Sequence, residues 1–458
     1  EDTSAVTQSG SGDFSGLQVT LSQTENLVNQ VIHITWSGGK PTKPDFGNLG
    51  INYLQIMQCW SSPDDTEPSR EQCEFGGQRS FNGGQNFNSR QMDTSSASDP
   101  LETDYGKNVV EGLSYIPFVS WKDDSEVGSK SSYFDRYTTN EVDGSRTRRD
   151  GTGEEFFEVL TGVEAPGLGC GQKSASGFAP KCYVVVVPRG STEVDGTERG
   201  LANGDPLDTS PLLASNWANR IVFPLSFQPV GQACAIGGDE VPLLGSDRAA
   251  EAVTRWQPAL CASGDGNFSF TVLSDGEARA KLQSGSPDMA FVTYPLEPDA
   301  VAADKPVVYA PVALSGLTVA FNLERQTSTL APDEERLKDG ERVTQIKVNQ
   351  RLMAKMLTQA YRYDTAPKPD KVAKNPWDLA QDPEFLALNP DFKALMIPAL
   401  GHILVSIGQS DTAALVWKWI WADPEARAWL QGKPDPWGTR IYPTYKRSEE
   451  HTSELQSR

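Results

Sequence analysis

The hydrophobic pattern of this chain changes near residue 229, and the change divides the sequence into two kinds of fold. Before that point, apolar residues occur in short β-branched or aromatic runs. In one of them Ile32, Ile34 and Trp36 alternate with more polar residues, which is typical of a half-buried strand. Beyond it, strand-like runs alternate with helical segments, which favours an α/β domain. The chain has 458 residues, and we expect it to be multidomain.

The first part, residues 17–228, is predicted to be a β-sandwich because it contains short strands separated by polar turns. Two long polar insertions, 81–108 and 122–153, are expected to be partly mobile surface loops, and 191–215 is expected to cross the surface. Residues 1–16 are polar and are expected to form a disordered N-terminal arm. The expected strands are 17–21, 28–36, 51–59, 115–121, 155–160, 182–187 and 220–227.

The second part, residues 229–446, is predicted to be the α/β domain, with helices at 246–256, 277–282, 349–361 and 411–421. In the third helix Leu352 and Met356 are four residues apart on one face, and Asn349 is a suitable N-cap. Two Asp-Pro-Glu triplets, which begin at Asp382 and Asp423, each supply an N-cap oxygen, a proline at the first helical position and an early negative charge.

The six cysteines form three pairs that are close in sequence and contain no CxxC motif. With only three histidines in the chain, this spacing favours three disulfides over a zinc site. Disulfides indicate an oxidising compartment, so we expect a secreted or cell-surface protein whose polar first residues follow a removed signal peptide. The expected pairs are Cys59 with Cys73, Cys170 with Cys182, and Cys234 with Cys261.

The charge balance and the motifs exclude several classes of function. There are 61 acidic and 41 basic residues without a basic cluster, which disfavours nucleic acid and anionic membranes as partners. The apolar stretch 395–407 is too short to span a bilayer, so membrane contact is expected only through a missing C-terminal segment or a transporter. No enzyme signature is found, and no metal or cofactor is expected; the acidic loop 150–154 lacks the spacing of a calcium loop.

The last twelve residues, RSEEHTSELQSR at 447–458, resemble a translated sequencing adaptor. We therefore interpret them as a non-native tail and expect the native chain to continue differently after about residue 446.

Three segments carry a resemblance to a known family. These are DMAFVTYPL at 288–296, KPVVYAPVALSGLTVAFN at 305–322, and 377–412 with its DPEFLALNP and QSDT runs. They resemble the central stretch of phosphate-type solute-binding proteins of ABC transporters, which have a periplasmic-binding-protein fold. The resemblance implies two α/β lobes that close on a ligand, with helix N-termini supplying N–H groups to an anion. The N-terminal strands also look like the Ig-like modules of actinobacterial surface proteins.

The family likeness implies that four segments line an anion site. The first turn corresponds to the segment at Ser246, and the second to Ser274 and Asp275. The third segment ends at Thr293, where the family has a carboxylate that accepts the phosphate proton. The fourth is 406–412, in which Ser410 and Thr412 remain.

Two positions of the fourth segment depart from the family pattern. Ser406 stands where the family has an arginine, and Asp411 stands where it has a glycine. Loss of a charge-assisted partner typically lowers affinity for a buried anion about a thousandfold, so tight phosphate binding is not expected. A purely structural alternative is that Ser410, Asp411 and Thr412 cap a helix.

Two functional hypotheses remain open from the sequence. In the first, the chain is a non-catalytic extracytoplasmic binding protein that holds phosphate, another small oxyanion or a polar solute between two lobes. In the second, the site is degenerate and the chain is a surface interaction or adhesion module with a protein partner. Arg248 or Arg279 in the site would favour the first, and Asp275 facing Asp411 would favour the second.

Overall fold

In the computed structural model the described residues are 4–44, 49–77, 86–94, 97–122, 125–127, 131–174, 177–200, 206–230, 240–263, 267–285, 288–297, 301, 306–314, 316–328, 330–336, 338–364, 372–396 and 410–446. The chain divides into two compact units, Glu1–Gln232 and Ala233–Arg458.

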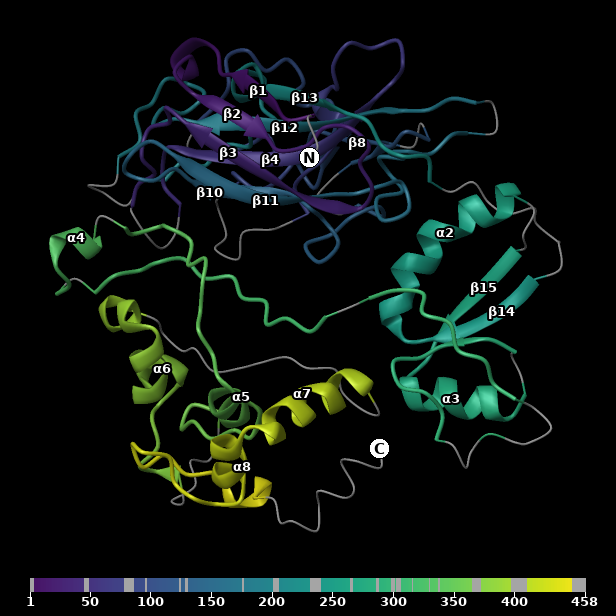
Figure 1. Cartoon of the computed structure of the whole chain (residues 1–458). Helices are drawn as coiled ribbons and strands as arrows, with labels where there is room; N and C mark the ends of the chain where they lie inside the picture. Colours follow the sequence, from purple (N-terminus) through teal and green to yellow (C-terminus); the bar gives the residue numbers. More distant parts are fainter. Residues whose placement is uncertain are drawn as a thin grey trace. The chain divides into compact units, whose positions relative to one another are not determined.

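Unit 1 contains a four-stranded antiparallel sheet in the order β1-β2-β3-β11 (Figure 1). Its strands are β1 (Val6–Ser9), β2 (Gln18–Leu21), β3 (Gln30–Ser37) and β11 (Gly153–Val159). In β3 the side chains of Ile32, Ile34 and Trp36 are buried while their neighbours are not. The alternation seen in the sequence therefore does select one face of this sheet.

A second antiparallel sheet has the order β10-β4-β12-β13, with β5 paired to β4. Apolar residues of both sheets form one continuous core, so the two sheets pack face to face. The strands are β4 (Tyr53–Ser61), β5 (Cys73–Glu74), β10 (Val142–Arg146), β12 (Lys181–Arg189) and β13 (Ile221–Leu225).

The outer face of this second sheet is also covered. All nine residues of β4 are buried, because Met57 and its neighbours on that face contact Met92, Ile116 and Leu212 from connecting segments. The expectation that 81–108 and 191–215 are surface loops is therefore wrong for part of their length. Apolar residues spaced among polar ones cover a sheet face there. Short elements in unit 1 are β6 (Val109–Val110), β7 (Leu113–Ser114), β8 (Phe118–Val119), β9 (Ser125–Glu126) and α1 (Ala214–Trp217).

The N-terminal arm differs from the sequence expectation. Residues Val6–Ser9 are not disordered but pair with β2, and the Gln8 side chain donates a hydrogen bond to the Val222 carbonyl 2.7 Å away. Backbone pairing accepts polar side chains on the exposed face, which explains why composition alone misled the prediction. The insertion 122–153 likewise contains a strand, β10, whose pairing with β4 shifts register between Val142 and Ser145.

Disulfides join Cys59 to Cys73 and Cys170 to Cys182, as predicted. Cys261 is also disulfide-bonded, while its expected partner Cys234 lies outside the described residues. These bonds are consistent with an extracellular protein. Among the described helices, none is both long and apolar enough to cross a membrane.

Unit 2 begins with a parallel three-stranded sheet in the order β15-β14-β16, flanked by two helices (Figure 1). The strands are β14 (Glu240–Gly245), β15 (Asn267–Val272) and β16 (Ala290–Phe291), and the helices are α2 (Ala250–Ser263) and α3 (Asp275–Gln283). Strands alternating with helices agree with the predicted α/β pattern.

The remaining described α-helices of unit 2 lie between residues 333 and 430, and three of them begin at N-caps that the sequence predicted. Asn349, Asp382 and Asp423 each accept a hydrogen bond from a backbone N–H in the first turn of the following helix. The helices are α4 (Asp333–Arg336), α5 (Gln350–Leu357), α6 (Pro383–Leu388), α7 (Asp411–Ala422) and α8 (Pro424–Leu430). Leu352 and Met353 are buried in the two cores that α5 joins.

Candidate functional site

The parallel sheet of unit 2 brings three separate turns to one edge. Parallel strands end on the same side, so the residues that follow β14, β15 and β16 lie near one another. These residues are Ser246 and Arg248, then Asp275, then Tyr294. The first turn of α7, a fourth segment distant in sequence, is hydrogen-bonded to them.

Arg248 and Asp275 form the first of two ion pairs at this edge. The Arg248 Nη2 atom lies 3.1 Å from Asp275 Oδ1 and 3.0 Å from Oδ2. The Arg248 Nε–H donates to Ser246 Oγ at 3.2 Å, and that hydroxyl donates to Asp247. The Asp275 side chain is 4% exposed, so its charge is held by the guanidinium rather than by water.

The second ion pair joins α3 to α7. Arg279 donates two hydrogen bonds to Asp411, from Nη1 to Oδ2 at 2.7 Å and from Nη2 to Oδ1 at 2.9 Å. The backbone N–H of Tyr294 adds a third hydrogen bond to Asp411 Oδ2 at 3.2 Å. Donation to this carboxylate raises the pKa of Arg279 above its ordinary value, against the opposing effect of burial.

A backbone hydrogen bond connects the two pairs. The N–H of Asp411 in the first turn of α7 donates to Asp275 Oδ2 at 3.1 Å. A helix N-terminus attracts anions through its free N–H groups and its dipole, and here the anion is a carboxylate of the same chain. Two arginines and two aspartates give no net charge, so Asp275 and Asp411 do not repel each other as unpaired carboxylates would.

The predicted site residues have different fates in this arrangement. Asp275 and Asp411 lie in the ion pairs, and Ser246 contacts Arg248. Ser274 is the N-cap of α3 and accepts a hydrogen bond from the Glu277 N–H, so its hydroxyl is used for capping. Thr293 is exposed, and Ser410 and Thr412 are half-buried at the start of α7, where Ser410 makes no side-chain cap. Ser406 lies outside the described residues.

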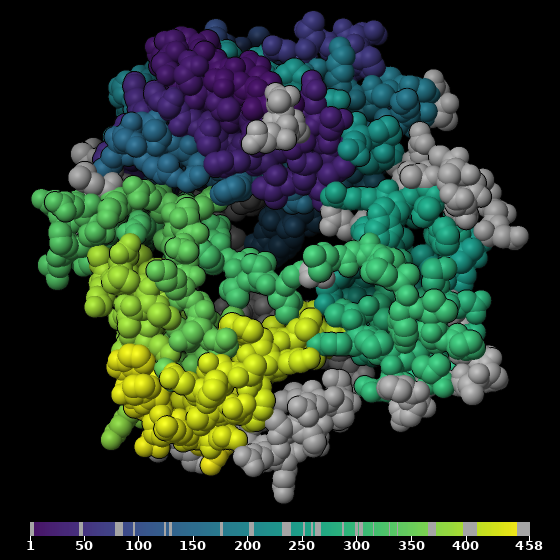
Figure 2. Space-filling view, viewed as in Figure 1, coloured from purple at the N-terminus to yellow at the C-terminus, as the bar shows by residue number. Residues whose placement is uncertain are grey.

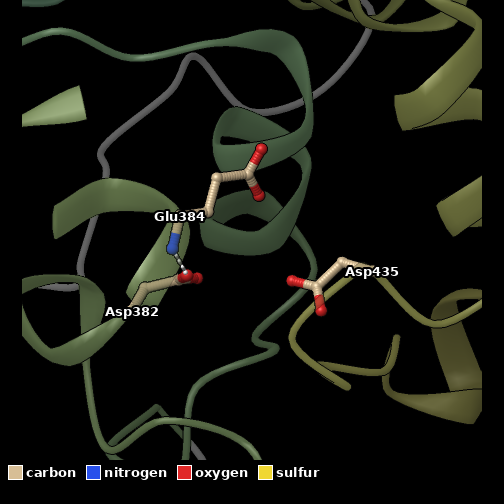
Figure 3. Close-up of side chains that lie close together, drawn as sticks. All are labelled: Asp382, Glu384 and Asp435. Atoms are coloured by element: carbon tan, nitrogen blue, oxygen red, sulfur yellow. Dashed lines mark hydrogen bonds between the residues drawn. The ribbon is translucent and has the colours of Figure 1, made fainter. Parts of the chain in front are cut away.

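A second group of acidic side chains lies in the helical part of unit 2, where Figure 3 shows Asp382, Glu384 and Asp435. Carboxylate oxygens of the three lie within 4.8 Å of one another, close enough to hold a metal ion. The Lys355 ammonium contacts all three, at 2.8 Å from Asp382, 2.9 Å from Glu384 and 2.6 Å from Asp435. The Lys355 ammonium thus occupies the position between the carboxylates that a metal ion would need.

The charges of this second group are matched by further donors. Burial alone would lower the pKa of Lys355, but the carboxylates outweigh it and the pKa is raised. Arg351 donates to both oxygens of Glu384, and Tyr361 donates its hydroxyl to Asp382. The group fastens α5 to α6 and to the turn at Asp435, and we interpret it as structural.

The acidic stretch 150–154 is a turn that leads into β11, and its carboxylates bond within the chain. Asp150 accepts hydrogen bonds from the backbone N–H and the hydroxyl of Thr152, while Glu154 pairs with Arg148 and His33. Such Asp-to-Thr bonding two residues along the chain is typical of turns.

Comparisons of the chain with protein-family models, with curated proteins and with solved structures found no match.

Proposed function

We propose that this chain is a non-catalytic, extracytoplasmic interaction or adhesion module in which the anion-binding edge of an α/β unit is filled by the chain's own carboxylates. The proposal keeps the periplasmic-binding-protein-like scaffold implied by the sequence resemblance, and the Ig-like interpretation of unit 1. It assigns contact with a protein partner to surfaces other than this edge.

The observation that carries the proposal is the hydrogen bond from the Asp411 N–H to Asp275, which is itself paired with Arg248. The donors best suited to an oxyanion at this edge are a guanidinium and a helix N-terminus, and both already bind Asp275. Arg279 is used in the same way by Asp411. An incoming oxyanion would have to displace a carboxylate that is held at high effective concentration.

Oxyanion capture is the second candidate, and one observation favours it. Arg248 and Arg279 reach the edge, with side chains 27% and 20% exposed, so a solute could contact them from outside. In that case phosphate, sulfate or another small anion would join the ion pairs rather than replace them.

A thermal-shift titration separates the two candidates. The wild-type protein is titrated with phosphate, sulfate, acetate and a sugar panel, and the interaction module predicts no rise in melting temperature. An anion that binds the folded state, present at a concentration of about 100 times its dissociation constant, would stabilise the fold by about 2.7 kcal/mol. A rise with phosphate or sulfate in the wild type would therefore replace the first candidate with the second.

The variant Asp275→Ala tests whether the carboxylate stands in for a ligand. Removing it leaves the Arg248 guanidinium and the Asp411 N–H without their anion, so we expect a lower melting temperature that millimolar acetate or formate restores in part. Asp288→Ala is the matched control, since Asp288 is exposed and acetate should not affect it. An Asp275→Ala protein that melts like the wild type would show that the carboxylate does not hold this edge together.

A further inference from the structure

Residues 306–322 expose far more apolar surface than a segment of a soluble protein normally does. Val308 is 90% exposed and Leu314 is fully exposed, while Leu317, Val319 and Phe321 are close to half exposed. Large contiguous apolar exposure marks an interaction site. Figure 2 shows this part of the chain, in green, at the molecular surface.

The backbone of the same segment forms no regular structure where it is described. Among its described residues, 306–314 and 316–322, there is no helix or strand, and none exchanges a backbone hydrogen bond with another described residue. N–H and C=O groups that bond to no other described residue, beside apolar side chains, are what a second strand needs in order to pair. The segment contains no charged residue that would oppose pairing.

The sequence from residue 317 onward has the pattern of a one-sided strand. Leu317, Val319 and Phe321 alternate with Thr318 and Ala320, so an extended backbone places the three large side chains on one face. Antiparallel pairing of this stretch with an identical copy, centred on Val319, sets Leu317 opposite Phe321 and Val319 opposite itself. Every cross-strand pair on that face is then apolar, as in stable antiparallel sheets.

From this register we propose that residues 316–322 are a dimerisation strand, and that their occupant is the same segment of a second copy of this chain around a two-fold axis. A two-fold interface uses one patch on both subunits, which is what a self-complementary strand provides. The inference does not depend on the ion-paired edge, so either proposal can fail without the other.

The available area agrees with a stable dimer. The seven large exposed side chains of 306–322 contribute roughly 100 Å² each, or ~700 Å² per copy, close to the ~800 Å² that each partner buries in a standard interface. A two-stranded ribbon alone is marginally stable. Of the seven side chains, Val308, Val312 and Leu314 lie outside 316–322 and extend the apolar contact beyond the ribbon.

Charge sets the conditions for association. The chain has a formal net charge of −20, so two copies repel each other at low ionic strength. The proposed contact is uncharged, and salt both screens the repulsion and leaves the apolar contact intact. We therefore expect the dimer fraction to rise between low salt and 0.5 M salt, the opposite of an interface built on ion pairs.

The experiment measures the dimer dissociation constant of the full chain by sedimentation at several concentrations. Val319, which lies on the proposed two-fold axis, is replaced by charged residues of either sign. Val319→Asp and Val319→Lys each place like charges directly opposite each other, so each variant alone should raise the dissociation constant at least tenfold. Mixing the two variants pairs Asp with Lys and should restore the dimer. Val319 is 45% exposed, so neither change is expected to unfold the protein, which circular dichroism checks.

Val163→Asp is the matched control, since Val163 is 49% exposed and lies in unit 1. It should dimerise like the wild type. A wild-type chain that stays monomeric at all salt concentrations overturns the proposal. So does a dimer that survives both Val319 variants. Two variants that fail to pair when mixed would show that Val319 does not lie opposite itself, which overturns the proposed register.

Discussion

At the scale of single residues, Arg90 shows how a polar insertion is held against a sheet. Its guanidinium is buried and donates to five backbone carbonyls, those of Arg70, Cys73, Phe75, Ile116 and Pro117. Burial lowers its pKa to about 10, which leaves it charged at neutral pH. One side chain thus satisfies carbonyls from two segments, 70–75 and 116–117, that are far apart in sequence.

We expect Arg90→Lys to destabilise unit 1 by about 3 kcal/mol. The lysine ammonium has three N–H donors on one nitrogen and cannot reach the five carbonyls that surround the planar guanidinium. Urea unfolding followed by circular dichroism measures the loss. Arg136→Lys, on an exposed side chain, is the control and should change stability by less than about 0.5 kcal/mol. Equal stability of Arg90→Lys and the wild type would contradict the role given to the fork.

Glu74 gives a pH prediction. Burial, with a smaller contribution from Glu141, raises its pKa from 4.5 to about 8. The folded state therefore keeps a proton that the unfolded chain loses above pH 4.5, and stability should fall as pH rises from there toward 8. In Glu74→Gln this dependence is removed, so the variant should gain up to about 3 kcal/mol over the wild type at pH 7.

The measurement for Glu74 is the urea midpoint of both proteins at pH 5, 6, 7 and 8. Glu25→Gln, on an exposed side chain, serves as the control and should follow the wild type. A difference between Glu74→Gln and the wild type that stays constant with pH would show that Glu74 is ionised throughout.

At the scale of elements, the sequence predicted those features that depend on near neighbours. The three caps Asn349, Asp382 and Asp423 and the alternation in β3 each rest on residues within one turn or one strand, and all are present. The ion pairs could not be predicted in this way. Arg279 and Asp411 are 132 residues apart, and only the packing of α7 beside α3 brings them together.

The helical part of unit 2 supplies a test at the same scale. Lys355→Met removes the ammonium that three buried carboxylates share, and we expect a loss of about 3 to 5 kcal/mol. Millimolar Ca²⁺ should recover part of that stability in the variant only, since three carboxylates without the lysine are suitable ligands. Thermal unfolding with and without Ca²⁺ measures both effects.

Lys418→Met, on the exposed face of α7, is the control for this change and should affect neither stability nor the response to Ca²⁺. If Lys355→Met were as stable as the wild type, the three carboxyl groups would have to be neutral or solvated once the lysine is gone, and the group would not fasten α5 to α6.

At the scale of the whole molecule, two compact units of different architecture should unfold as two events. The disulfide between Cys59 and Cys73 lies in unit 1, where it joins β4 to β5 across a sequence separation of 14. Replacing both cysteines by alanine removes this cross-link and raises the conformational entropy of the unfolded chain. The free energy of unfolding should fall by about 3 kcal/mol. For a unit of this size that corresponds to a fall of roughly 6 to 12 °C in the melting temperature.

Differential scanning calorimetry assigns this loss to a unit. Only one of two transitions should move in the Cys59→Ala, Cys73→Ala protein, and the same transition should move in Arg90→Lys, because both changes lie in unit 1. Lys355→Met should move the other transition. If any one of these variants shifted both transitions together, the units would unfold as a single cooperative body. In units that unfold independently, a change in one leaves the free energy of unfolding of the other unchanged.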